Sequence, residues 1–595
     1  MSSSPATARP ATGPLSEVPA SPADVAAEAL LDAEARALAE TPPRRPGTTY
    51  RLQLHQGFRF IDAEAIVDYL DALGITDLYL SPYLDARPGS THGYDVFDHS
   101  RINLEIGDDE AHGRLVEALR ARGMGRVLDI VPNHMGVGGH NRYWLDVLEI
   151  GPQAPSARFF DIDWNPIKDE LEGRVLLPIL EDQYGKVLEA GKFRLERDGG
   201  QLFVRYGDTR LPLGPLSYGH VLERRTEQLL SHFDPEDPNL LEYRSIWDSA
   251  VSLPLRTVGD PDHVERKLRE KEVIKRRLER LCADCPELCT FLDGNIDQFH
   301  GNPGEPASFD LMHALLDEQV YRLAYWRVAS EEINYRRFFD INDLAGLRIE
   351  DPYVFDQVHD LIFRWVDDGV VTGLRIDHPD GLADPRGYFR RLQEQLLLRS
   401  CARRLDAEGR GDEWRDVAGP LRARYRRVLD HEPASPLARR FPVVVEKILS
   451  RGEDLPNDWP IDGTVGYEFL NALNGVFVDP GASEPILAIY AEFTGDREPF
   501  PEVLYHAKQL ICRASLASEI NALARQINRV SEADRRSRDF TLNELRVGLR
   551  EIIACFAVYR TYIQPGRPPS DRDRSTIEQA VARARRRNPT IDASI

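Results

Sequence analysis

The chain has no long apolar stretch and few cysteines, and each shortage excludes a class of protein. No run of about 18 apolar residues occurs, so we expect no membrane-spanning helix and no membrane partner. The first residues lack a basic segment followed by an apolar one, so they do not resemble a signal peptide. Six cysteines in 595 residues are too few for a disulfide framework, which favours a reducing, cytoplasmic location.

Basic residues are also scarce relative to acidic ones. The chain has 75 Lys and Arg against 97 Asp and Glu, a formal net charge of −22. Such a surface repels phosphate backbones, so nucleic acid is an unfavourable partner, whereas a neutral substrate experiences no such repulsion. The length predicts at least two folded units, or one barrel with large insertions.

Three of the cysteines are close together in the sequence and raise the question of a metal site. Cys282, Cys285 and Cys289 are three and four residues apart, which places their thiols on one face of a helix. However, Pro286 interrupts this helix, no histidine is nearby, and zinc usually takes four ligands. We therefore predict buried structural thiols, and we expect neither a metal nor another cofactor.

Apolar runs and helical patterns alternate along two parts of the chain, which indicates βα units and a parallel sheet. The strand-like runs are Thr48–His55, Asp77–Tyr83, Arg126–His134, Val370–Leu382, Phe441–Leu449 and, more weakly, Thr464–Leu470. The predicted fold class is therefore α/β, a (β/α)8-type TIM barrel with a large α+β insertion after the third strand. Such a barrel has eight strands, so the sequence also predicts a barrel that is incomplete at its C-terminal end.

This pattern divides the chain into five predicted regions. An Ala/Pro-rich disordered tail with at most one short helix (1–46) precedes strands one to three (47–134). An inserted lid of hairpins and helices (135–335), with a hairpin turn at Asp198-Gly199-Gly200, separates them from strands four to six (336–480). A helical extension (481–595) follows and ends before strands seven and eight.

Polar residues follow three of the predicted strands at their C-terminal ends. Barrel active sites lie at that edge, so these side chains are expected to converge. Any one of them alone is more typical of a helix cap or a surface ion pair, but together on successive strands they indicate a site. The residues are Asp129, Asn133 and His134 after the third strand, Arg375, Asp377 and His378 on the fourth, and Glu446 on the fifth.

Asp377 and Glu446 are the pair that retaining glycoside chemistry requires, one carboxylate as nucleophile and one carboxylic acid as proton donor. Arg375 precedes Asp377 by two residues and lies on the same side of the strand, where its charge is expected to keep Asp377 ionised. Glu446 ends an apolar strand, and partial burial there is expected to raise its pKa and keep it protonated.

Short motifs around these residues resemble the α-amylase superfamily, glycoside hydrolase family 13. DIVPNH, GLRIDH and VVVEKIL resemble its first three signature regions, in the same order. The resemblance implies that Asp377 is the nucleophile, Glu446 the acid/base and Arg375 the support of the nucleophile. It implies further substrate-site residues: His134 and Tyr94 (in GSTHGYDVFD) at the sugar, Asp129 and Asn133 at the floor of the site, and His378 beside the nucleophile.

Longer strings resemble the maltooligosyl trehalose synthase family within that superfamily. They include TYRLQLHQGF, YLSPYLDARPGSTHGYDV, NYRRFFDINDLAGLR and DGTVGYEFLN, and the likeness runs from about Thr48 to the end. The resemblance implies that the reducing-end α-1,4 linkage of a maltooligosaccharide is converted to an α-1,1 linkage through a covalent intermediate on Asp377. It also implies a functional link to a maltooligosyl trehalose hydrolase.

Such a transfer must exclude water, which competes for the intermediate, and the inserted region is a candidate lid. Its aromatic residues are candidate sugar platforms, of which about half are expected to be ordinary core. They are Tyr143, Trp144, Phe159, Phe160 and Trp164.

The superfamily also uses a third carboxylate, an aspartate directly after a histidine near strand seven. No aspartate after Glu446 follows a histidine, so the sequence predicts an incomplete catalytic set. The alternatives that remain open are an α-glucan hydrolase, a 4-α-glucanotransferase, and a non-catalytic remnant that binds glucan.

Overall fold

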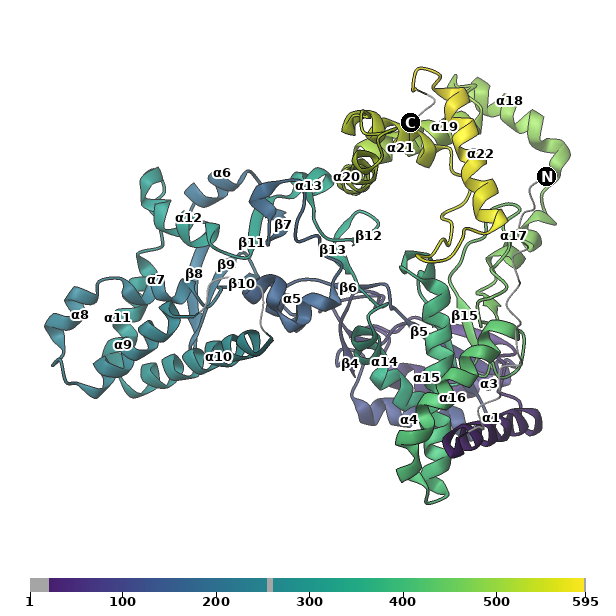
Figure 1. Cartoon of the computed structure of the whole chain (residues 1–595), viewed down its shortest axis with the longest axis horizontal. Helices are drawn as coiled ribbons and strands as arrows, with labels where there is room; N and C mark the ends of the chain where they lie inside the picture. The colour runs from purple at the N-terminus through teal and green to yellow at the C-terminus, as the bar shows by residue number, and fades with distance from the viewer. Residues whose placement is uncertain (1–20, 254–260, 593–594) are drawn as a thin grey trace, which may run out of the picture. The chain divides into compact units, whose positions relative to one another are not determined.

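The computed structural model describes residues 21–253, 261–592 and 595 of the chain. These residues form two compact units (Figure 1). Within the described residues, the smaller unit comprises residues 21–45, Arg386–Pro442 and Pro456–Asp462, and the larger comprises the described parts of Pro46–Pro385, Val443–Leu455 and Gly463–Ile595.

The smaller unit is built from three helices around an apolar core. They are α1 (Pro22–Glu40), α15 (Pro385–Ala407) and α16 (Trp414–His431). A capping box between Ser21 and Asp24 starts α1, and its Ala27 and Leu30 are buried against α15 and α16. This burial explains why residues 22–40 form a helix within the segment predicted to be a disordered tail; residues 1–20 of that segment lie outside the described residues.

A six-stranded parallel sheet is the centre of the larger unit. Its order is β1 (Thr49–Leu52), β2 (Asp77–Leu80), β5 (Gly125–Ile130), β14 (Gly373–Ile376), β15 (Val443–Val445) and β16 (Gly463–Thr464). Every residue of β5 and of β14 is buried, as expected for parallel strands covered on both faces. The sheet is part of a (β/α)8-type barrel and confirms the predicted fold class.

The sixth strand is much shorter than the sequence indicated. Thr464–Leu470 was the weaker strand prediction, but the strand ends at Thr464 and a helix begins at Tyr467. Gly466 lies between them with a φ of 98°, a left-handed conformation that breaks the extended chain.

Helices and a short antiparallel pair of strands connect the first strands of the sheet. They are α2 (Phe60–Ala65), α3 (Val67–Ala72), β3 (Leu84–Ala86), β4 (Val96–Ile102) and α4 (Asp109–Ala121), with α14 (Pro352–Asp367) before β14. Asp108 and Asp351 cap α4 and α14 through their side chains.

The region between β5 and β14 forms three small sheets and a group of helices. The sheets are β6 (His134–Gly136) with β13 (Ile341–Gly346) and β12 (Arg337–Phe338); β7 (Val175–Leu180) with β11 (Tyr321–Tyr325); and β8 (Phe193–Asp198), β9 (Gln201–Tyr206) and β10 (Thr209–Pro212). The predicted hairpin at Asp198-Gly199-Gly200 is confirmed, because Asp198 pairs with Gln201 across the turn.

Most helices of this region lie around β7–β11, and α13 lies beside α20 (Ala517–Ala533; Figure 1). The helices of the region are α5 (Arg142–Ile150), α6 (Tyr184–Glu189), α7 (Ser217–Glu223), α8 (Thr226–His232), α9 (Pro238–Val251), α10 (Pro261–Asp284), α11 (Pro286–Asp297), α12 (Asp310–Asp317) and α13 (Ala329–Glu332).

The three clustered cysteines lie where α10 meets α11. Cys285 is buried, Cys282 and Cys289 are half-buried, and all three are free thiols. Within the described part of the chain, no group of three or more His, Cys, Asp or Glu side chains is placed to hold a metal ion.

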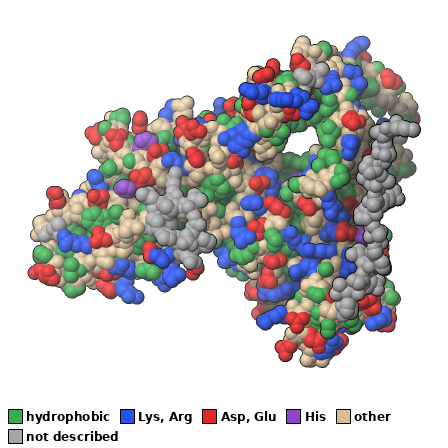
Figure 2. Space-filling model, viewed as in Figure 1, with side chains coloured by type: hydrophobic (Ala, Val, Ile, Leu, Met, Phe, Trp, Pro, Cys, Tyr) green, Lys and Arg blue, Asp and Glu red, His purple; other side chains and the backbone are tan. Residues whose placement is uncertain are grey.

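In the described part of the chain, six α-helices follow β16. They are α17 (Tyr467–Gly475), α18 (Ser483–Thr494), α19 (Phe500–Arg513), α20 (Ala517–Ala533), α21 (Leu542–Ala554) and α22 (Asp571–Arg587). Many apolar side chains of α17–α19 are exposed, Phe493 by 90%, and Figure 2 shows hydrophobic side chains at the surface among charged ones. Among the described helices, none has the length and apolar character to cross a membrane.

Candidate active site

The C-terminal ends of three neighbouring strands bring the predicted site residues together. Asp129 lies on β5 opposite Arg375 on β14, and Asp377 directly follows β14. The backbone N–H of Asp377 donates to Ile130 O at 2.9 Å, and that of Glu446 donates to Ile376 O at 3.0 Å. The sheet's own hydrogen bonds therefore fix the spacing of the carboxylates.

Arg375 is the centre of this cluster. Its Nη1 donates to Asp129 Oδ1 at 2.7 Å and to Asp377 Oδ1 at 2.8 Å, and its Nη2 lies 3.2 Å from Glu446 Oε2. Burial by itself lowers the pKa of Arg375, but Asp129 and the other acidic neighbours outweigh it and raise that pKa above its ordinary value. One buried guanidinium thus contacts three carboxylates.

Asp377 differs from the expectation in its protonation. Burial is the largest influence and raises its pKa; Arg375 opposes this, while Asp129 and Glu446 add to it, and the pKa is raised to about 8. Arg375 therefore acts on this pKa in the predicted direction, but burial, the largest influence, outweighs it. Oδ2 of Asp377 is buried and has no hydrogen-bond partner among the described residues, so it is the oxygen left for a substrate.

Glu446 lies at the open side of the cluster, and about a quarter of its side chain is exposed. The backbone N–H of His378 donates to its Oε2 at 3.1 Å. His378 adopts a left-handed conformation with a φ of 41°, which is uncommon for a residue with a side chain. This backbone turn directs the N–H of His378 at Glu446.

Tyr94 and Asp129 form the floor of the cluster together with two residues that the sequence analysis missed. Tyr94 OH donates to Asp129 Oδ2 at 2.7 Å, and Tyr79 OH donates to the same oxygen at 3.3 Å. Arg51 donates to Tyr94 Oη at 2.9 Å and lies 3.4 Å from Asp129. Burial raises the pKa of Asp129, although Arg375 opposes it. Arg51 and Tyr79 lie on β1 and β2, which were predicted as strands without functional residues.

His134 and Asn133 lie behind this floor. The His134 ring is buried and stacks on Phe338 with the ring centroids 4.3 Å apart. Burial lowers the pKa of His134 to about 3, so its imidazole is neutral. Asn133 Oδ1 accepts from Arg336 Nη1 at 2.8 Å, which ties the end of β5 to the segment before β12.

Comparison with known proteins shows which proteins the chain is similar to. Residues 64–183 match the family described as alpha amylase, catalytic domain. The chain is 32% identical over 495 residues to a putative maltooligosyl trehalose synthase of Mycobacterium tuberculosis, which covers 82% of this chain and 46% of that protein. The structure of maltooligosyltrehalose synthase from Arthrobacter ramosus is 32% identical, with a TM-score of 0.60 over 92% of this chain and 52% of that one.

The chain is a homologue of the maltooligosyl trehalose synthases. It spans about half the length of the synthases that it matches. Its similarity to an intracellular maltogenic amylase of Bacillus subtilis is more local, 38% identity over 112 residues and 18% of each chain.

A segment after α21 contacts the site. The sequence did not predict this contact. Arg560 Nη1 donates to the carbonyl oxygens of Asp380 at 2.9 Å and Leu382 at 2.6 Å. Asp380 Oδ2 lies 3.0 Å from Nζ of Lys447, a fully buried side chain directly after Glu446. Tyr562 OH also donates to Asp380. Arg560 and Tyr562 therefore brace the two segments that follow Asp377 and Glu446.

Most of the predicted sugar platforms in the inserted region are core residues. Trp144, Phe159 and Phe160 are each at most 3% exposed. Trp144 packs edge-on against Phe160 at a centroid distance of 5.0 Å, and Tyr143 contacts Phe159 at 4.6 Å. Tyr143 and Trp164 are half-buried. Burial against one another explains why at least three of the five are unavailable to a sugar.

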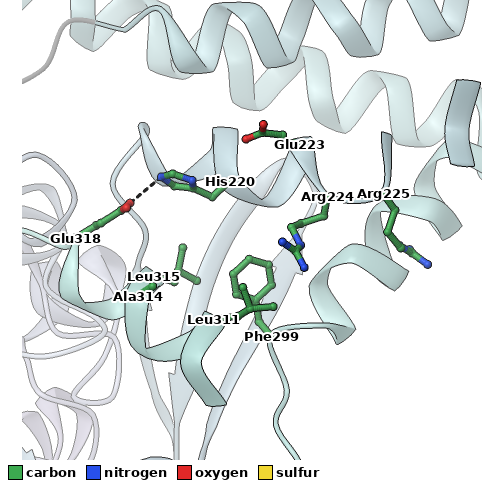
Figure 3. A pocket seen from close by; sticks show the side chains of 9 residues that line it. All are labelled: His220, Glu223, Arg224, Arg225, Phe299, Leu311, Ala314, Leu315 and Glu318. Carbon is green, nitrogen blue, oxygen red and sulfur yellow. Dashed lines mark ion pairs between the residues drawn. The ribbon is translucent and has the colours of Figure 1, made fainter. Parts of the chain in front are cut away.

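The inserted region has a cavity of its own, with a volume of about 380 Å³ (Figure 3). His220 of α7 and Glu318 at the end of α12 form an ion pair at its rim, 2.9 Å apart, and Phe299 and Leu311 lie opposite Arg224. None of the predicted site residues lines this cavity. The candidate active site is therefore the strand edge around Arg375.

Proposed function

We propose that the chain carries the nucleophile and acid/base of a synthase that converts the reducing-end α-1,4 linkage of a maltooligosaccharide to an α-1,1 linkage. One observation carries the proposal: Arg375 holds both Asp377 and Glu446, at 2.8 and 3.2 Å, in a homologue of maltooligosyl trehalose synthases. Asp129 and Arg375 orient the nucleophile, and His378 orients the acid/base through its backbone N–H.

The proposed reaction has two displacements at one anomeric carbon. In the first, Oδ2 of Asp377 bonds to C1 of the penultimate glucosyl unit while the C1–O4 bond breaks and Glu446 gives its proton to O4. In the second, the anomeric hydroxyl of the released glucose attacks C1, Glu446 takes the hydroxyl proton, and the bond to Asp377 breaks. The sum is an isomerisation that consumes no water.

Tyr94 and His134 are proposed to contact the sugar bound at this carbon. Both lie at the same strand edge, and the Tyr94 ring centroid is 5.8 Å from Arg375 Cζ. His134 Nε2 is buried without a hydrogen-bond partner among the described residues, which leaves it for a sugar hydroxyl. Asn133 is proposed to hold the loop beneath. The inserted region 135–335 is proposed as the lid that excludes water.

The matched synthases' names support a maltooligosyl trehalose product. A functional link to a maltooligosyl trehalose hydrolase, which consumes such a product, is part of the proposal. Six free cysteines support a reducing compartment such as the cytoplasm. The second candidate is glucan binding without turnover.

Incubation with maltopentaose separates these functions. A synthase lowers the number of reducing ends and forms a trehalose-ended product, a hydrolase raises it, and a 4-α-glucanotransferase leaves it constant. We expect a fall that Asp377→Asn and Glu446→Gln each abolish, whereas Asp85→Asn, at a surface ion pair with Arg101, leaves it unchanged. Binding of maltopentaose by calorimetry without any product would support the second candidate and contradict the first.

A further inference from the structure

Two helices present one face each to the cavity of the inserted region. Side chains three and four residues apart on a helix share a face. The face at α7 consists of His220, Glu223 and Arg224, and the face at α12 consists of Leu311, Leu315 and Glu318. Between them the cavity of about 380 Å³ stays open, whereas protein interiors are normally packed without voids of this size. The volume is within the range of small-molecule sites, about 300–1,000 Å³.

The guanidinium of Arg224 is fixed toward this cavity. Its Nε and Nη2 both donate to Gln298 Oε1 at 3.2 Å. These two donors lie on one edge of the guanidinium, so Nη1 on the other edge is available to a ligand. Figure 3 shows the Arg224 side chain pointing toward Phe299 and Leu311. A donor is therefore held in place above an apolar surface.

The next residue, Arg225, positions Arg224 through the backbone. Its φ of 53° is left-handed, which is unfavourable for a residue with a side chain and is concentrated at functional sites. Its side chain points away from the cavity, where Nε donates to Asn295 Oδ1 at 2.9 Å and Nη2 donates to Phe291 O at 3.0 Å (Figure 3). Asn295 is fully buried and donates to Val221 O of α7 at 3.0 Å. The turn is thus anchored to both α7 and α11 without a ligand.

The rim of the cavity carries charges of both signs. Arg224 and Glu223 line it, and His220 Nε2 lies 2.9 Å from Glu318 Oε2, with about half of each side chain of this pair exposed. An ion pair so exposed contributes little to stability, so the fold alone does not require it. A ligand with a net charge is attracted by one sign and repelled by the other. The rim therefore favours a neutral ligand with hydroxyl groups, each of which can donate and accept.

The floor of the cavity is apolar. Phe299 is 3% exposed, Leu315 is 2% exposed and Leu311 is half-buried. Figure 3 shows Phe299 and Leu311 next to each other below Arg224. A hydrocarbon ligand would cover this floor but would remove water from the charged rim without replacing its hydrogen bonds. A pyranose has both parts, because its C–H faces are apolar and its edge carries hydroxyl groups.

We propose that this cavity is a second saccharide site, which binds a neutral sugar of one or two hexose units. The floor packs against a C–H face of the sugar, Arg224 donates to its hydroxyl oxygens, and Glu223 and Glu318 accept from its hydroxyl groups. The cavity shares no lining residue with the strand edge around Arg375. The inference therefore does not rest on the proposed function, since a chain without turnover can still bind a sugar here.

Amide hydrogen exchange of the whole chain, measured by mass spectrometry with and without maltose, tests the second site. We expect maltose to slow exchange at residues 217–225 and 311–318. Arg224→Met keeps an extended side chain without its donors and is expected to weaken this binding about tenfold, the equivalent of about 1.4 kcal/mol. Ala314→Phe fills the cavity from an exposed position of α12 and is expected to abolish the protection. Ala582→Phe, at an exposed alanine of α22, is the matched control and is expected to leave it unchanged.

The outcomes separate this site from the strand edge. Asp377→Asn removes the proposed nucleophile and is expected to leave the protection at both segments intact. If maltose protects neither segment, or protects both equally in Ala314→Phe, the second site is wrong whatever the chain catalyses. Protection by leucine, a zwitterion with an apolar side chain, in place of maltose would overturn the sugar assignment. Thermal unfolding midpoints identify a variant that has lost its fold, and the other cavity variant then decides.

Discussion

At the scale of single residues, the decisive feature is that three carboxylates share one guanidinium, that of Arg375. A guanidinium paired with one carboxylate lowers the pKa of that carboxylate, but here the same side chain contacts Asp129, Asp377 and Glu446. Burial then outweighs the attraction at Asp377, and its pKa is raised to about 8. The site residues were predictable from the strand ends; the direction of this pKa shift was not, because it depends on burial and on the number of acids around one base.

The raised pKa of Asp377 makes both stability and activity depend on pH. An unfolded aspartate titrates near 4, so between about pH 4 and 8 the folded state binds more protons and loses stability as the pH rises. Asp377→Asn does not titrate, and its unfolding temperature relative to the wild type is expected to be higher by several °C at pH 8 than at pH 4. Glucosyl transfer needs ionised Asp377 and is expected to increase as the pH approaches 8. A temperature difference that is constant with pH would contradict this assignment.

Removal of the shared cation is expected to destabilise the fold. Arg375→Met removes the guanidinium that contacts three carboxylates at the strand edge. Loss of one partner of a buried ion pair lowers the free energy of unfolding by about 3–5 kcal/mol. Arg101→Met removes an exposed partner of Asp85 and is expected to cost less than about 1 kcal/mol. Denaturant unfolding of both variants measures the difference, and equal losses would show that the cluster is not buried in solution.

At the scale of elements, the β-rich runs predicted five of the six strands. Fully buried parallel strands such as β5 and β14 are rich in hydrophobic residues, whereas β1 is mostly exposed. The sixth was overpredicted because Gly466 turns the chain after Thr464. The contact of residues 559–562 with the site was not predictable, since Arg560 binds backbone carbonyls about 180 residues away in sequence and no side-chain motif marks such a partner. The burial of Ala27 and Leu30 was also not predicted, because the Ala/Pro-rich composition of their segment is typical of a disordered tail.

Removal of the Arg560 side chain is expected to make the segment after Asp377 more mobile. Hydrogen bonds from a charged donor contribute about 1.5–3 kcal/mol each, and Arg560→Ala removes two of them. We expect faster amide hydrogen exchange at residues 380–384, weaker maltopentaose binding and a lower free energy of unfolding. Arg567→Ala, at an exposed arginine of the same segment, serves as the control. Unchanged exchange in Arg560→Ala would contradict the brace.

At the scale of the whole molecule, the helices after β16 present an unusual amount of apolar surface. Phe477 is 82% exposed, Phe493 90% and Phe500 73%. Extensive exposed apolar surface is characteristic of interaction sites and of proteins that associate.

The chain is therefore expected to associate as its concentration rises. Sedimentation velocity is expected to show species larger than the 67.5 kDa monomer, and Phe477→Ser with Phe493→Ser is expected to shift the distribution toward the monomer. Tyr69→Ser, on α3, is the control for a general gain in surface polarity. A wild type that is monomeric at all concentrations would contradict the expectation.

The strand edge has fewer arginines than carboxylates, and this imbalance affects how many protons it binds. The three acids Asp129, Asp377 and Glu446 face two bases, Arg51 and Arg375. Electrical neutrality is then reached when the cluster binds one proton. In the proposed reaction, Glu446 gives one proton in the first displacement and takes one back in the second. The proposed isomerisation therefore exchanges no net proton with the solvent during a cycle, and its rate is expected not to depend on the buffer concentration.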